Sequence, residues 1–181
     1  STFNLNVVNP PAITTTLDVN SGTFFRLVDT VGVSPVSASG GYGSISFSIN
    51  PSLPTGLSFS SSNGRISGIA SQLSSQVHTI TATDSLGQTS GKNYSLTITY
   101  SPLTTALVVA STVATKGKPI TSFTPVTSAG GSGSTTFSIG PSLPAGLSFN
   151  VSTGQVSGTP SESIVESTFT VTATDSPANT S

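Results

Sequence analysis

The sequence contains no cysteine, methionine or tryptophan, and only 6% of its residues are charged. Without cysteine the chain can form no disulfide and no thiolate metal site, and it has no cysteine nucleophile. Folding must therefore rest on packing and hydrogen bonding. The formal net charge is −1, so the chain has no extended basic face that could neutralise phosphates, and nucleic acid is not expected as a partner.

Long apolar runs are also missing. Hydrophobic residues make up 34% of the chain but are dispersed among serine, threonine and glycine, and no run approaches the roughly 20 residues that cross a bilayer. Residues 1–8 have neither the basic start nor the apolar stretch of a signal peptide. The sequence predicts no membrane span in this segment.

An internal repeat organises the sequence. The segment NPSLPTGLSF at 50–59 returns ninety residues later as GPSLPAGLSF at 140–149. The segment TATD at 81–84 returns at 172–175, ninety-one residues later, so one extra residue lies in the connection before that strand. A loop can absorb such an insertion. The repeat predicts two modules of about ninety residues each.

The two ends of the chain fit the same repeat. The segment TFNLNV at 2–7 resembles NYSLTI at 93–98, so we interpret residues 1–8 as the last strand of a preceding module. The first complete module is predicted at 9–100. The second is predicted at 101–181 and lacks a counterpart of 93–98, its closing strand. We therefore expect the chain to be a segment of a longer protein.

Secondary structure is predicted to be β throughout. Apolar and polar residues alternate at Ile45–Ile49 and at Tyr94–Ile98, a period of two that indicates strands with one buried face. Segments 77–83 and 169–174 are rich in β-branched residues. The dipeptide Asn63-Gly64 is predicted to supply the positive φ angles of a tight hairpin. Such short strands indicate antiparallel Greek-key β-sandwiches.

The repeated motif resembles a known family. PSLPxGLSF, a glycine turn, Ile or Val followed by Ser-Gly, and finally TATD are similar to the bacterial immunoglobulin-like domains related to dystroglycan-type cadherin-like domains. The motifs at 51–68 and 141–158 carry this resemblance. It implies tandem immunoglobulin-like antiparallel Greek-key β-sandwiches, and a role in spacers, stalks or binding surfaces of secreted, surface-anchored and phage proteins.

Calcium is the metal to consider, because cadherin-like domains bind it and it takes about six to eight oxygen ligands. Asp84 and Asp175 each stand at a strand end, before a serine and a turn. The sequence has no acidic cluster of the cadherin kind, and an aspartate there more often caps a turn through nearby backbone amides. We expect no cofactor, and Asp84 and Asp175 are the calcium ligands to test.

Catalytic residues are not predicted. His78 is the only histidine; we place Thr170 at its position in the second module and expect a surface side chain. No Gly-x-Ser-x-Gly elbow frames a serine nucleophile. The sequence predicts that the protein is not an enzyme.

Sugar binding is a second hypothesis, because small β-sandwiches bind sugars on exposed aromatic rings. Tyr42 lies in the glycine-rich turn 40–43 and is the best candidate ligand-binding residue. Its repeat partner is Ser132, so this site would belong to the first module alone.

The function predicted is that of a non-catalytic stalk or spacer in a larger bacterial surface or phage virion protein, extracellular, at the cell surface or in the virion. Pro102 in the junction 100–103 would limit bending between modules. The expected partners are neighbouring modules or subunits of the same assembly, and surface glycans. The alternatives are a carbohydrate-binding accessory module of a secreted enzyme and a lattice subunit joined by strand exchange, in which residues 2–7 of one chain complete the second module of another.

Overall fold

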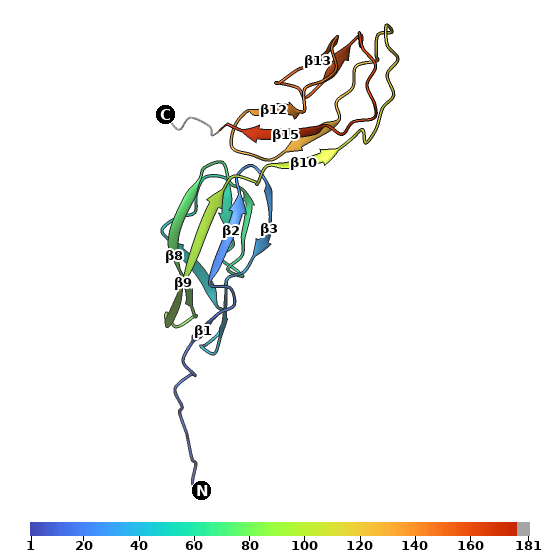
Figure 1. Cartoon of the computed structure of the whole chain (residues 1–181). Helices are drawn as coiled ribbons and strands as arrows, with labels where there is room; N and C mark the ends of the chain where they lie inside the picture. The colour runs from blue at the N-terminus through green and yellow to red at the C-terminus, as the bar shows by residue number, and fades with distance from the viewer. Residues whose placement is uncertain (177–181) are drawn as a thin grey trace. The chain divides into compact units, whose positions relative to one another are not determined.

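The computed structural model describes residues 1–176, and these form only β-strands and loops. The predicted all-β class is therefore confirmed. The chain divides into two compact units, Ser1–Thr99 and Tyr100–Ser181, whose strands are drawn in Figure 1. None of the described residues forms a helix that could pass through a lipid bilayer.

The first unit is built from two facing sheets. One sheet has the strand order β2-β9-β8-β5 and the other β3-β7-β6, and β1 pairs with β4. All pairs are antiparallel except β2–β9, which is parallel. The strands are β1 (Thr14–Leu17), β2 (Ser21–Phe25), β3 (Asp29–Val33), β4 (Val36–Ser39), β5 (Ser46–Asn50), β6 (Leu57–Phe59), β7 (Ile66–Ile69), β8 (Ser74–Thr83) and β9 (Thr89–Thr99).

The core of this unit lies between the two sheets. Alternate residues of β8 and β9 point inward, as their period of two predicts, and they meet apolar side chains from the opposite sheet. The PSLPxGLSF motif adds apolar side chains at the edge of this core. The buried cluster is Val36, Ile66, Ala70, Ile80, Tyr94, Leu96 and Ile98, with Leu53, Leu57 and Phe59 partly buried against it.

Strand β9 has a hydrogen-bonded strand partner on each side. It pairs in parallel with all of β2 and antiparallel with all of β8. Residues 79–83 of β8 also pair with β5, whereas residues 74–78 pair only with β9. Both β2 and the first half of β8 therefore depend on β9 as their only strand partner.

The second unit repeats six of these strands in the same order. The pairs β10–β11, β12–β15 and β13–β14 correspond to β1–β4, β5–β8 and β6–β7. The strands are β10 (Thr104–Leu107), β11 (Val126–Ala129), β12 (Thr135–Gly140), β13 (Leu147–Phe149), β14 (Val156–Gly158) and β15 (Thr170–Asp175).

The segments of the second unit that form no strand follow a pattern. Residues 111–115, at the position of β2, and residues 165–169, at the position of the first half of β8, are outside any strand. The position of β3 keeps one bridge, between Phe123 and Val156. Within residues 100–176 no strand occupies the position of β9. Residues 177–181, the end of the predicted second module, lie outside the described residues.

Residues 1–8 form no strand, although their apolar residues alternate as in β9. Their hydrophobic side chains are exposed, with Phe3 at 84%, Leu5 at 74% and Val7 at 83%. Their assignment as the last strand of a preceding module stays a prediction.

His78 contradicts its predicted surface position. The side chain is fully buried, and Nδ1 lies 2.8 Å from the Pro51 carbonyl oxygen. Because a carbonyl oxygen only accepts, Nδ1 carries a hydrogen and donates it. The predicted counterpart was also wrong: Ile80 pairs with Ile49 and Val171 with Ile139, so the strand alternation places Phe169, and not Thr170, at the position of His78.

The predicted tight turn at Asn63-Gly64 is a longer loop. Phe59 pairs with Ile66 across residues 60–65. Gly64 has a positive φ of 68°, and the Asn63 side chain accepts a hydrogen bond from the Arg65 amide at 3.1 Å. The glycine thus has its expected role, while the asparagine closes the loop through its side chain.

We expect Leu96→Ala to destabilise the first unit by about 2–5 kcal/mol, because Leu96 is fully buried and its removal leaves a cavity. The matched control Leu86→Ala removes a side chain that is 60% exposed and should change the free energy of unfolding by less than about 0.5 kcal/mol. Urea unfolding followed by tyrosine fluorescence measures both. Equal losses in the two variants would contradict this assignment of the core.

Candidate functional site

The candidate site of the first unit is a carboxylate that holds a glycine-rich loop. Asp84 follows β8 directly and is buried. Its Oδ2 accepts a hydrogen bond from the Tyr42 amide, and its Oδ1 accepts from the amides of Leu86 and Gln88, all at 2.9 Å. One side chain thus joins the turn after its own strand to the loop at 40–43.

These hydrogen bonds govern the ionisation of Asp84. Burial raises the pKa of the carboxyl group, but backbone hydrogen bonds, from Tyr42 and Gln88 among others, stabilise the charged form. The net effect lowers the pKa below its ordinary value of 3.8. The carboxylate is therefore ionised at neutral pH and firmly bonded.

The second unit repeats this arrangement with Asp175. Its Oδ2 accepts from the Ser132 amide at 2.6 Å and from the Ser132 hydroxyl at 2.7 Å, and its Oδ1 accepts from the Gly133 amide at 2.9 Å. The Ser132 hydroxyl and amide lower the pKa of Asp175 more than burial raises it, and the Gly133 amide lowers it further.

Glycine is required where each loop passes over its carboxylate. Gly41 and Gly131 have φ values of 72° and 88°, in the region that side chains disfavour. A methyl group on Gly41 would lie 3.0 Å from the Cβ and Oδ2 atoms of Asp84. The repeated glycine pair therefore allows the close approach of loop and carboxylate.

This geometry bears on the calcium hypothesis for Asp84 and Asp175. Their oxygens face amide hydrogens, whose partial positive charge favours an anion and opposes a cation. Among residues 1–176, no three His, Cys, Asp or Glu side chains gather where they could hold a metal ion. Calcium binding by this pair stays a prediction, and the hydrogen bonds favour the capping role.

Tyr42 lies on the surface while its backbone is fixed. Its side chain is 59% exposed, its amide bonds to Asp84, and its carbonyl accepts from the Ser85 amide at 3.0 Å. The loop therefore presents an aromatic ring on a constrained backbone. Ser132 takes the corresponding position in the second unit and bonds to Asp175 in the same way.

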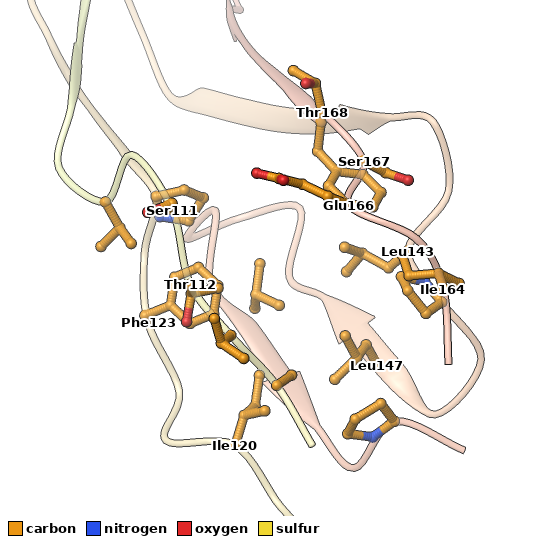
Figure 2. A pocket seen from close by; sticks show the side chains of 18 of the residues that line it. Ser111, Thr112, Ile120, Phe123, Leu143, Leu147, Ile164, Glu166, Ser167 and Thr168 are labelled. Atoms are coloured by element: carbon orange, nitrogen blue, oxygen red, sulfur yellow. The ribbon is translucent and has the colours of Figure 1, made fainter. Parts of the chain in front are cut away.

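A different kind of site exists in the second unit. A groove of about 690 Å³ runs between residues 111–114 and 162–169. Figure 2 shows Ser111 and Thr112 on one side and Glu166, Ser167 and Thr168 across from them, with the apolar side chains of Leu143 and Leu147 lower in the view. Sequence reasoning had identified a missing strand here but not the residues that line its place.

The comparisons with known proteins concern both units. The family model described as "Putative Ig domain" matches residues 6–99 and, a second time, residues 101–181. A search of the curated proteins found no match.

Several solved structures are similar. Protocadherin Gamma B2 extracellular cadherin domains 3–6 are 18% identical, covering 94% of this chain and 49% of that chain, with a TM-score of 0.44. Mouse Cadherin-23 EC22-24 is 17% identical (92% and 60%, TM-score 0.39). A protein described as a putative alpha-galactosidase from Bacteroides fragilis is 24% identical (53% and 19%, TM-score 0.39). The chain spans less than two thirds of each of these structures.

We expect acid to weaken the two loop attachments. A carboxyl group whose pKa is lower in the folded chain stabilises the fold fully above its unfolded value, near 3.8, and this stabilisation is lost as the pH falls toward the folded pKa. The midpoint temperature of thermal unfolding should therefore decrease once the pH is lowered below about 5. Asp84→Asn should lower the midpoint at pH 7 and show a smaller further loss in acid.

Calorimetry at a series of pH values measures this effect. Asp29→Asn is the matched control, because Asp29 is exposed and accepts none of these loop hydrogen bonds. An Asp84→Asn variant with the stability and acid dependence of the unaltered chain would contradict the role assigned to this carboxylate.

Proposed function

The chain belongs to the Putative Ig domain family over both of its units, and from this premise we propose that it is a structural or adhesion module of an extracellular protein. More specifically, we propose a non-catalytic stalk or spacer of a bacterial surface or phage virion protein. Its mechanism is mechanical: modules in series give reach, and the molecule presented at the end of the series does the binding.

The tandem repeat is the observation that carries this proposal. Six strands, the glycine loop and the carboxylate attachment recur in both units. The features that recur are those that make the fold. Repetition of a scaffold without repetition of a reactive group is what a spacer requires.

The polar groups also support a non-catalytic role. His78 is buried in the core and bonded to Pro51, and Asp84 and Asp175 are occupied by loop amides and hydroxyls. A general base must reach the proton of a substrate. These three side chains therefore have structural roles, because each is hydrogen-bonded within the fold.

Sugar binding is the second candidate, favoured by the exposed ring of Tyr42 on its fixed loop. A constrained aromatic ring can stack on a sugar with little loss of conformational entropy. This role would make the first unit a binding module, as in an accessory domain of a secreted carbohydrate-active enzyme.

Labelling of intact cells or particles tests the main proposal. An antibody raised against residues 1–99 should label the source cells, or the virions they release, without permeabilisation, because the module is proposed to lie outside the cell. An antibody against a cytoplasmic protein is the control. Labelling that requires permeabilisation of the cells would contradict the extracellular assignment.

Binding to a glycan array tests the second candidate. If Tyr42 stacks on a sugar, Tyr42→Ala should abolish retention, whereas Tyr42→Phe keeps the ring and should retain most of it. Ser132→Tyr places a ring at the same position of the second unit. Glycan binding that is unchanged in Tyr42→Ala, or absent from the unaltered chain, would exclude this role.

A further inference from the structure

Two loops of the first unit meet at the carboxylate of Asp84. Its Oδ2 accepts a hydrogen bond from the Tyr42 amide and its Oδ1 accepts one from the Leu86 amide, each at 2.9 Å. The Ser85 amide donates to the Tyr42 carbonyl at 3.0 Å, so the two loops are also bonded directly to each other. Tyr42 and Leu86 therefore occupy neighbouring backbone positions, although they are far apart in sequence.

The side chains of both residues are on the surface. Tyr42 is 59% exposed and Leu86 is 60% exposed. One buried carboxylate thus fixes the backbone of an exposed aromatic residue and of an exposed aliphatic residue on adjoining loops. Together they offer apolar surface that a ligand can remove from water.

The two loops are locked in place before any ligand arrives. The Ser44 amide donates to the Ser85 hydroxyl at 3.0 Å, and the Gly41 amide donates to the Pro11 carbonyl at 3.0 Å. A methyl group on Gly43 would lie 2.5 Å from the Ser85 hydroxyl oxygen, so this close approach depends on glycine. A surface whose backbone is already fixed loses little conformational entropy when a ligand binds.

The loops offer no charged side chain to a ligand. Residues 40–44 and 85–88 consist of glycine, serine, tyrosine, leucine and glutamine. The Asp84 carboxylate between them is buried and accepts hydrogen bonds from backbone amides. Because this surface has no group to pair with an ionic ligand, it fits a neutral one.

We propose that Tyr42 and Leu86 together form a subsite for a neutral sugar that carries a methyl group, either on a deoxyhexose of the fucose type or on an N-acetylhexosamine. The C–H face of the sugar ring stacks on the Tyr42 ring, and the methyl group lies against Leu86. This rests on the sugar-binding candidate described above, and it adds the class of sugar and a second binding residue.

The selectivity for a methyl group follows from the chemistry of Leu86. A methyl group gains free energy when it leaves water for an aliphatic side chain. A hydroxymethyl group in its place loses a hydrogen bond to water that leucine cannot replace. The two effects together favour the methyl sugar by about three- to tenfold in affinity. Tyr42 thus determines whether a sugar binds, and Leu86 determines which one.

The second unit provides an internal reference. Ser132 stands at the position of Tyr42, and its amide and hydroxyl both bond to Asp175. That loop therefore has the same kind of attachment without an aromatic ring. The proposed subsite belongs to the first unit alone.

Titration of the isotopically labelled chain, followed by the amide signals in NMR spectra, tests the proposal. L-fucose and L-galactose differ only in a methyl or a hydroxymethyl group at the same ring carbon. L-fucose should shift the amide signals of Tyr42 and Leu86, leave that of Ser132 in place, and bind about three- to tenfold more tightly than L-galactose. N-acetylglucosamine and glucose form the second pair, which distinguishes an acetamido methyl group from that of a deoxyhexose.

Variants of the two residues separate the subsite from sugar binding in general. Leu86→Ala removes an exposed side chain, so the fold should be retained. This variant should lose the preference within the pair and keep weak binding of both sugars, because the Tyr42 ring remains. Leu86→Val is the conservative control and should keep most of the preference. Tyr42→Ala should abolish binding of all four sugars.

Three outcomes would overturn the proposal. Binding that depends on Tyr42 but is equally tight within both pairs would exclude the methyl subsite and leave sugar binding in place. A preference for the methyl sugar that persists in Leu86→Ala would remove Leu86 from the site. No shift of the Tyr42 signal with any of the four sugars would overturn the subsite together with the sugar-binding candidate.

Discussion

The backbone pairing of β9 is the contact on which the first unit depends. This strand bonds to β2 on one side and to β8 on the other, and its residues Tyr94, Leu96 and Ile98 form the centre of the core. In the second unit, where the described residues include no such strand, Phe169, Val171 and Ala173 are only half-buried. The sandwich is thus closed by its last strand, a contact between segments far apart in sequence.

Much of this fold could be predicted from local pattern. A period of two marks the buried faces of β5, β8 and β9, and a ninety-residue repeat marks the two units, because both patterns depend on residue type alone. The capping role of Asp84 could also be anticipated, since an aspartate after a strand end and before a turn commonly bonds nearby amides. These features need no knowledge of distant partners.

The misses have a common physical cause. His78 was placed on the surface from its position within a strand, whereas the Pro51 carbonyl, from another part of the chain, accepts its Nδ1 hydrogen in the core. Sequence pattern indicates which face a residue prefers, and a hydrogen-bond partner distant in sequence can reverse that preference.

The parallel pairing of β2 with β9 has a mechanical consequence. The chain enters this unit through β1 and β2 and leaves it through β9. Tension applied to the two ends would pull these parallel strands in opposite directions along their length, so the hydrogen bonds between Ser21–Phe25 and Ser95–Thr99 would be strained together in shear. They could not open one after another, as in a peeled hairpin.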